Sequence, residues 1–301
     1  MAKRSILHML DPNVHNSPFD INMAIDAGYD IAFPYSNVKL NEVSGLTQDA
    51  IFSRGPAGVK QTGLFIGGRE IGLALDMLDI AKKAMVPPFE ISVFADPSGA
   101  FTTAAALVAC VESQLKKHFN QELSGSKAIV FGGTGPVGLA TAVIAAQAGA
   151  KTTIVDHFSI QNAQACADEA KRRYGIELTP ASAAESADKA ALIEGFELIF
   201  STAPAGVQVL NELVLAAAKE LKVAGDVNAV PPAGIEGIGV MDLGEPLIHA
   251  TNAKGAVGVG ALAIGNVKYK VQHDLLSQTL ESEKPVYLDF RHAFDSARKL
   301  V

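Results

Sequence analysis

Short apolar runs alternate with helical patterns from one end of the chain to the other, and no other feature limits the fold as strongly. The runs and the helical patterns that follow them lie at 5–10 and 20–27, at 63–66 and 69–85, and at 91–95 and 100–119. Strands that alternate with helices form βαβ units, and such units build a parallel sheet covered by helices on both faces. The sequence therefore predicts an α/β protein.

A polar stretch at 121–126 interrupts this alternation, and a new apolar strand begins at Lys127. With 301 residues the chain is long enough for two domains. We expect one domain over residues 1–124, completed by 270–301, and a second domain over 125–269. In the second domain we expect strands near 152–155, 176–179, 198–201 and 222–227, and helices near 136–148, 161–174 and 187–194.

Composition excludes several classes of protein. The chain has 25 Lys and Arg against 32 Asp and Glu, a net charge of −7, and its basic residues form no patch, so we expect no nucleic-acid partner. The uncharged stretch at 128–150 contains glycines and a proline that indicate a strand, a turn and a helix, so no membrane partner is expected. The first residues lack the pattern of a secretory signal, which predicts the cytoplasm.

The residue types that bind metals do not gather in the sequence. Cys110 and Cys166 stand far apart without a C-x-x-C partner, and the seven histidines show no spacing typical of a metal site. We expect two buried thiols, no disulfide and no metal ion.

A glycine turn lies between the strand that begins at Lys127 and an alanine-rich helix. Its pattern is G-x-G-x-x-G in the strand–turn–helix context of dinucleotide-binding folds. The first glycine allows the tight turn, the second lets the backbone approach a diphosphate, and the third lets helix and strand pack closely. Unpaired N–H groups at the helix N-terminus then face the diphosphate. This pattern predicts a Rossmann-type domain with cofactor contacts from Gly133, Thr134, Gly135, Pro136, Val137 and Gly138.

Asp156 ends the strand that follows this helix, where a carboxylate is expected to accept hydrogen bonds from the adenosine ribose. A carboxylate there repels a 2′-phosphate, which favours NAD over NADP. No Arg or Lys follows it until Lys171. We expect NAD or NADP as cofactor, NAD being preferred, with His157, Ala203 and Asn228 also in the cofactor site.

Four longer strings occur in one order along the chain: FADPSGAFTTAA at 94–105, FGGTGPVG at 131–138, DVNAVPPAGI at 226–235 and GALAIGNVKYK at 260–270. Together they closely resemble the bacterial NAD(P)-dependent methylene-tetrahydromethanopterin dehydrogenases of one-carbon metabolism, over essentially the whole chain. The resemblance implies a dinucleotide domain and a second α/β domain for the pterin substrate, with the active site in the cleft between them. It also implies formaldehyde oxidation in methylotrophs and a homo-oligomer such as a trimer.

The resemblance also implies roles for individual residues. Asp96, Thr103 and Lys268 match positions that line the pterin end of the cleft in this family. Lys268 would be the most important of these side chains and is the expected catalytic residue. Ser98 and Thr102 are expected to bind the substrate beside them. From the residues alone, Asp96 and the two threonines are equally suited to capping a helix, and Lys268 to a solvated helix face.

The residue after Asp156 bears on the choice of cofactor. The family's NADP-dependent branch carries an Arg just after this strand, whereas the present chain has His157 near that place. The chain therefore resembles the branch that accepts NAD as well as NADP.

The implied reaction removes a hydride from the methylene carbon between two pterin nitrogens and leaves a methenyl cation. No hydroxyl proton leaves, so no general base is needed, and the protein's task is to position the reactants. Three alternatives stay open. They are a methylene-tetrahydrofolate dehydrogenase, a different NAD-linked dehydrogenase with an acid–base pair in its first domain, and an NAD-binding redox sensor.

Overall fold

The computed structural model describes residues 4–301, which divide into two compact units. Unit 1 holds the described residues up to Thr102 and Tyr269–Ser296, and unit 2 holds Thr103–Lys268 and Ala297–Val301. The first two changes of unit along the chain fall inside long helices. Helical hydrogen bonds continue across such a point, so the composition of the chain gives no sign of it. The domain bounds inferred from the sequence, 1–124 with 270–301 and 125–269, remain a prediction.

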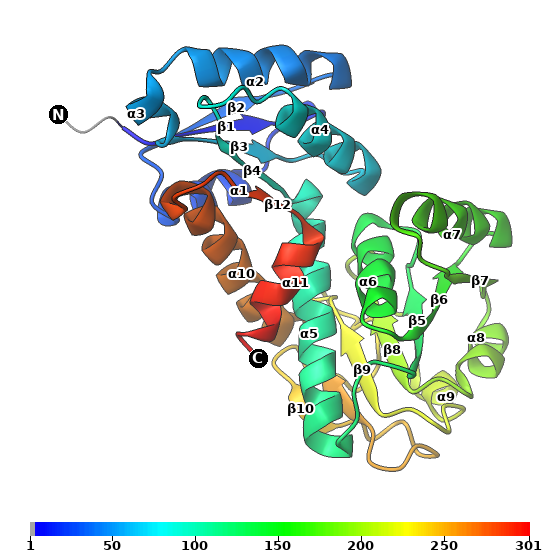
Figure 1. The fold of residues 1–301 in the computed structure, drawn as a ribbon. Coiled ribbons are helices and arrows are strands. Elements are labelled where there is room, and N and C mark those ends of the chain that lie inside the picture. Colours follow the sequence, from blue (N-terminus) through cyan, green and yellow to red (C-terminus); the bar gives the residue numbers. More distant parts are fainter. Residues whose placement is uncertain (1–3) are drawn as a thin grey trace. The chain divides into compact units, whose positions relative to one another are not determined.

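A five-stranded parallel sheet forms the centre of unit 1, in the order β12-β4-β3-β1-β2 (Figure 1). Its strands are β1 (Ile6–Leu10), β2 (Ile31–Tyr35), β3 (Thr62–Ile66), β4 (Ser92–Ala95) and β12 (Tyr287–Leu288). The helices are α1 (Pro18–Asp26), α2 (Val43–Phe52), α3 (Pro56–Val59), α4 (Ile71–Lys83), α5 (Ala100–Phe119), α10 (Ala261–Glu281) and α11 (Phe290–Arg298), of which α5, α10 and α11 extend across both units. Short 3-10 turns lie at Leu40–Glu42 and Pro97–Gly99.

The late segment of the chain returns to this sheet. Strand β12 pairs with β4, and Gln272 on α10 donates to Asp20 on α1 at 2.6 Å. On the same helix, Thr279 hydrogen-bonds the Tyr29 hydroxyl at 2.9 Å, so α10 is tied to the region of β2 by buried polar contacts. Such contacts persist because a buried polar group without a partner is costly.

Strand β2 was not predicted from the sequence, because it lies at the edge of the sheet and has little apolar pattern. Phe33 of this strand is exposed and Pro34 interrupts its pattern. A proline cannot donate to the strand ladder and is tolerated at an edge. Strand β3, in the middle of the sheet, is by contrast buried along its whole length.

A seven-stranded sheet forms the centre of unit 2, in the order β10-β11-β9-β8-β5-β6-β7. Its strands are β5 (Lys127–Phe131), β6 (Lys151–Asp156), β7 (Thr179–Ser182), β8 (Leu198–Ser201), β9 (Val223–Asp226), β10 (Leu243–Pro246) and β11 (Val257–Val259). The helices are α6 (Pro136–Gln147), α7 (Ile160–Tyr174), α8 (Ser186–Ile193) and α9 (Glu212–Leu215). Only β10 runs antiparallel to its neighbour. Counted in chain order, the six parallel strands lie as 3-2-1-4-5-6, the arrangement of dinucleotide-binding α/β folds. The predicted α/β class and Rossmann-type unit are confirmed.

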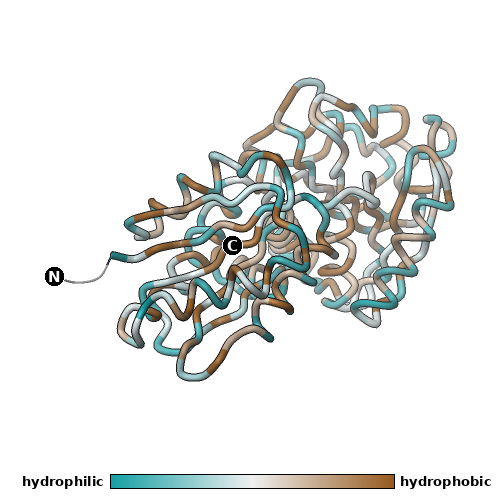
Figure 2. The backbone as a smooth tube through the Cα atoms, turned by 90° about the horizontal axis from the view of Figure 1, so that it is seen from above, coloured by the Kyte–Doolittle hydropathy of each residue, from teal (hydrophilic) through white to brown (hydrophobic). Residues whose placement is uncertain are grey.

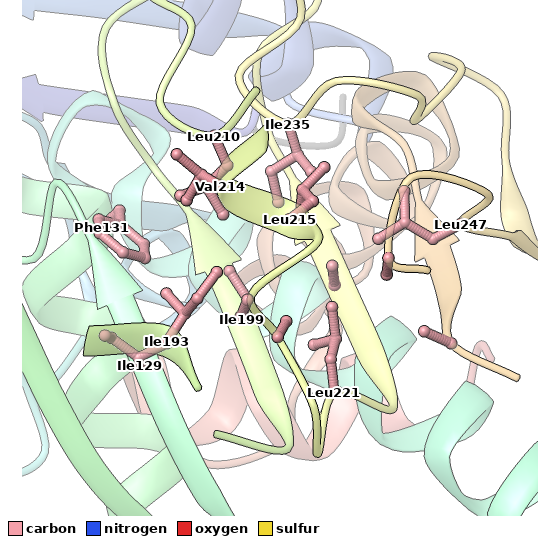
Figure 3. Close-up of a cluster of buried hydrophobic side chains, with 14 of the residues drawn as sticks. Ile129, Phe131, Ile193, Ile199, Leu210, Val214, Leu215, Leu221, Ile235 and Leu247 are labelled. Carbon is pink, nitrogen blue, oxygen red and sulfur yellow. The ribbon is translucent and has the colours of Figure 1, made fainter. Parts of the chain in front are cut away.

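Hydrophobic side chains from the strands and from two short helices pack one face of this sheet (Figure 3). Ile129 and Ile199 project from β5 and β8 toward Ile193 of α8 and Leu215 of α9, and all four are buried. On the other face, α6 contacts β5 and β6. Figure 2 shows that hydrophobic and hydrophilic stretches alternate along the backbone.

One predicted strand of unit 2 was misplaced. The expectation of a strand at 176–179 is wrong, because β7 occupies Thr179–Ser182. Its bounds follow from its partner, since Thr179 pairs with Thr153 and Ser182 with Asp156. An edge strand with few buried residues has little apolar pattern of its own, so its position is set by the strand beside it.

Candidate functional site

The turn between β5 and α6 is held together by close backbone packing. A Cβ at Gly138 would lie 2.1 Å from the carbonyl oxygen of Gly132, and one at Gly133 would lie 2.8 Å from Cβ of Ile154. Neither position accepts a larger residue. The tight turn itself belongs to Gly132, whose φ of +71° is in the left-handed region. The G-x-G-x-x-G pattern predicts that role for Gly133, whereas the structure gives it to Gly132, the glycine just before the pattern.

Gly135 has a different environment. A Cβ there would meet only the Gly132 oxygen, at 3.4 Å, so the space beside it is open. In the first turn of α6, Pro136 has no N–H, and within residues 4–301 the N–H groups of Val137 and Gly138 have no helical carbonyl to bind. Open space beside a glycine together with free N–H groups at a helix start suits an anionic diphosphate.

Asp156 lies at the end of β6 and is connected to the glycine turn. The Thr134 hydroxyl donates to its Oδ2 at 2.7 Å. Its Oδ1 accepts the N–H groups of Phe158 and Ser159 at 2.9 and 2.8 Å, and the side-chain amide of Asn162 at 3.3 Å. The carboxylate therefore holds the start of α7 against the turn that precedes α6.

The hydrogen bonds to Asp156 also set its charge. Burial raises the pKa of this carboxyl, but the hydrogen bonds from Thr134, Ser159, Phe158 and Asn162 outweigh burial and bring the pKa below its usual value. Asp156 is thus an ionised acceptor at neutral pH. Beside it, His157 and Phe158 are exposed, with their rings 5.0 Å apart edge to face.

The loops after β8 and β9 lie at the same edge of the sheet. Ala203 lies next to the glycine turn, with its backbone nitrogen 2.9 Å from the place of a Cβ at Gly132. The side-chain oxygen of Asn228 accepts the N–H groups of Gly206 and Val230, and its amide nitrogen donates to the Pro232 carbonyl. Asn228 therefore connects the two loops.

Two residues at this edge were missed by sequence analysis. The Thr202 hydroxyl donates to the Phe131 carbonyl at 2.7 Å, which ties β8 to the glycine turn. Asp226 is buried at the end of β9 and accepts the N–H groups of Asn228 and Ile235. Burial raises the pKa of Asp226 despite these hydrogen bonds. Asp226, like Asp156, comes at the end of an apolar run, and this pattern in the sequence could have identified it.

At the carboxyl edge of the unit 1 sheet, Asp96 follows β4 and caps the start of α5. Its Oδ1 accepts the N–H groups of Phe101 and Thr102 at 2.9 and 3.2 Å, and its Oδ2 accepts the Thr102 hydroxyl at 2.6 Å. Asp96 and Thr102 are both buried. These contacts match the helix-capping interpretation of the two residues and fix the direction in which α5 leaves the sheet.

Ser98 and Thr103 are more accessible than their neighbours. Ser98 is exposed, has a φ of +52°, and donates from its hydroxyl to the Gly68 carbonyl at 2.8 Å. Thr103 is half-buried on α5. Ser98 thereby connects the loop after β4 to the loop after β3, while Thr103 begins the part of α5 that belongs to unit 2.

Lys268 is half-buried in the N-terminal half of α10, at the end of the unit 2 segment. Nowhere in residues 4–301 do three His, Cys, Asp or Glu side chains come together as a metal site would require. No helix in this part of the chain has both the length and the apolar character needed to cross a membrane. Cys110 is a buried free thiol whose pKa burial raises to about 12, whereas Cys166 is only partly buried, so the expectation of two buried thiols was half right.

Similar proteins are found along the whole length of this chain. The family model described as "Methylene-tetrahydromethanopterin dehydrogenase, N-terminal" matches residues 18–98. The NAD(P)-dependent methylenetetrahydromethanopterin dehydrogenase of Methylorubrum extorquens is 49% identical over 298 residues, covering 99% of each chain. The chain belongs to this dehydrogenase family. The resemblance predicted from the four sequence strings is confirmed.

Solved structures agree on the fold. The NAD-dependent malic enzyme of Thermotoga maritima is similar with a TM-score of 0.59 at 11% identity, covering 98% of this chain and 84% of that one. Quinate dehydrogenase of Corynebacterium glutamicum, solved in complex with NAD, has a TM-score of 0.51 at 12% identity, covering 97% and 98%. At such identities the likeness concerns the fold alone.

The packing of the glycine turn predicts opposite effects for two alanine substitutions. Gly135→Ala should leave the melting temperature unchanged, because the added Cβ meets nothing closer than 3.4 Å, but should weaken NADH binding at least about tenfold by filling the diphosphate space. The matched variant Gly138→Ala should lower the melting temperature, because its Cβ would overlap the Gly132 oxygen. Fluorescence titration and thermal unfolding measure the two effects. Unchanged NADH binding by Gly135→Ala would show that no diphosphate approaches this glycine.

Proposed function

We propose that this chain transfers a hydride from methylene-tetrahydromethanopterin to NAD+ or NADP+ and releases methenyl-tetrahydromethanopterin. The observation that carries this proposal is the 49% identity, over 99% of the chain, to a dehydrogenase named for this substrate and for NAD(P). The open space beside Gly135 and the ionised Asp156 in unit 2 support a dinucleotide site.

In unit 2, each residue of the cofactor site has a task that its contacts suggest. The backbone at Gly133–Gly138 receives the diphosphate, and Asp156 accepts hydrogen bonds from the adenosine ribose. Thr134 already occupies one oxygen of Asp156, so this hydroxyl positions the carboxylate before the ribose arrives. When bound, the nicotinamide accepts the hydride. Ala203 and the loops joined by Asn228 border the nicotinamide end, and His157 borders the ribose.

In unit 1, the carboxyl edge of the sheet takes the pterin. Ligands of open α/β sheets bind outside the carboxyl ends of the strands, which is where Asp96 and Ser98 lie. Asp96 and Thr102 act by fixing the start of α5, and Ser98 and Thr103 present hydroxyl groups near that start. Hydride loss from an N–CH2–N group releases no proton, so these residues orient the substrate and no general base acts.

Lys268 is proposed to orient the substrate and not to exchange a proton. A cation beside a donor that becomes cationic raises the energy of the transition state unless a counter-charge or a carbonyl oxygen balances it. The pterin carbonyl is such a partner. This role rests on the family resemblance of the string at 260–270.

The family resemblance also supports a proposal for the assembly and the location of the chain. We infer a homo-oligomer in the cytoplasm, a trimer being the form that the resemblance implies. Two free thiols, Cys110 and Cys166, are compatible with a reducing compartment.

The purified protein should reduce NAD+ with methylene-tetrahydromethanopterin as donor, followed as NADH absorbance, and should use NADP+ with a lower kcat/KM because Asp156 repels the 2′-phosphate. Methylene-tetrahydrofolate serves as a parallel donor that shares the reacting ring system. NAD binding without turnover of either donor would favour a redox sensor and overturn the proposal.

Asp156→Ala should shift the ratio of kcat/KM for NAD+ to that for NADP+ toward NADP+ by about tenfold, or about 1.4 kcal/mol of differential binding. The substitution removes the ribose acceptor and the repulsion of the 2′-phosphate together. Asp168→Ala, which removes an exposed carboxylate from α7, is the matched control and should leave the ratio unchanged. A ratio that stays constant in Asp156→Ala would show that this carboxylate does not face the ribose.

Lys268→Ala should lower kcat/KM for the pterin at least about 100-fold, or about 2.7 kcal/mol, while the affinity for NAD stays nearly unchanged. The pH profile of the wild type should show no limb from a catalytic base. Lys270→Ala, on the exposed surface of the same helix, is the control. If Lys268→Ala keeps the wild-type rate, Lys268 does not orient the substrate. If its affinity for NAD falls as much as its kcat/KM for the pterin, Lys268 belongs to the cofactor site instead.

A further inference from the structure

Five aspartates end or directly follow strands of the two sheets, and each accepts a backbone N–H from the loop or helix start that comes after it: Asp11, Asp96, Asp156, Asp226 and Asp289. In four of them the second carboxylate oxygen is occupied as well. The donors to this second oxygen are the Thr102 hydroxyl at Asp96, the Thr134 hydroxyl at Asp156, the Ile235 N–H at Asp226 and the Arg291 guanidinium at Asp289.

Asp11 is the exception. Its Oδ1 accepts the Asn13 N–H at 2.7 Å, but within residues 4–301 no group donates to Oδ2. The residue is only 5% exposed. Three buried side-chain polar atoms in this part of the chain are sealed from solvent without a partner, and Asp11 Oδ2 is not among them. It is therefore an acceptor on a buried side chain that still reaches the surface.

The surroundings of Asp11 are shaped to leave this oxygen accessible. A Cβ at Gly67 would lie 2.6 Å from Oδ2, so the glycine at the end of β3 makes room for the carboxylate. Gly68 has a φ of +102°, and its carbonyl accepts the Ser98 hydroxyl. Loops from the adjacent strands β1, β3 and β4 thus meet at the carboxyl edge where ligands of α/β sheets bind.

We propose that Asp11 Oδ2 accepts hydrogen bonds from the 2-amino-4-oxopyrimidine edge of the pterin substrate. This edge presents two adjacent donors, the exocyclic amine and the ring N3–H. The oxygens of a carboxylate are hydrogen-bond acceptors, so the carboxylate of Asp11 and the two donors of this edge are complementary. Burial of Asp11 holds the acceptor in one orientation. The inference rests on the proposed function, since it names the group that recognises the substrate of that reaction.

Asp11→Asn tests the proposal with a small change in shape. The amide oxygen can keep the hydrogen bond from Asn13, which turns the new NH2 group toward the ligand and sets donor against donor. Pterin and lumazine, which replaces the 2-amino group with an oxygen, serve as probes in calorimetric titrations. The wild type should bind pterin at least about tenfold more tightly than lumazine, and the variant should bind both about equally.

Two further variants complete the experiment. Asp79→Asn makes the same change on an exposed site of α4 and should keep the wild-type preference. Gly67→Ala crowds Oδ2 without removing its charge and should reduce the preference, which gives a second test if Asp11→Asn does not fold. The inference is overturned if the wild type does not prefer pterin over lumazine. It is also overturned if the Asp11 and Gly67 variants fold and keep the wild-type preference. Probe binding needs no turnover. The titration can therefore fail while the dehydrogenase assay succeeds, or the reverse, so the two failures are distinguishable.

Discussion

The carbonyl oxygen of Gly132 lies 2.1 Å from the point that a Cβ at Gly138 would occupy, and much of unit 2 depends on this contact. It lets α6 begin after only four residues beyond the end of β5, with open space beside Gly135 just before the helix. The same turn brings Thr134 to Asp156 on the neighbouring strand. Close packing of backbone on backbone, which only glycine permits, therefore joins the glycine turn to the end of β6, where we propose that the diphosphate and the ribose bind.

A second constraint is common to both sheets. Parallel strands end at the same edge, and the loops that leave this edge carry N–H groups without strand partners. Aspartates at the strand ends bind these groups, and their charge depends on the balance between burial and donated hydrogen bonds. Donors prevail at Asp156, whose pKa lies below its usual value, while burial prevails at Asp226, whose pKa lies above it. Asp11 differs from the other strand-end aspartates in that only one of its two carboxylate oxygens accepts a hydrogen bond within residues 4–301.

How much of the site could be predicted depended on whether its signal was local. The pattern from Gly133 to Gly138 and the carboxylate at Asp156 are local features, and the structure puts them side by side. Thr202 has no such local signal. Its hydroxyl donates to the carbonyl of Phe131 on β5, which is far away in the sequence. Asp11 ends an apolar run just as Asp96 does, but only the absence of a second donor distinguishes it.

By itself, the sequence determined the alternation of strands and helices, the glycine turn and the family, because apolar periodicity and residue identity belong to single segments. Tertiary structure alone decided the bounds of β7, which follow from pairing with β6, and the place of β2 at an edge that tolerates Pro34. It also decided which carboxylate oxygens are occupied. Hydrogen-bond partners far apart in the chain meet only after folding, so no pattern within one segment contains them.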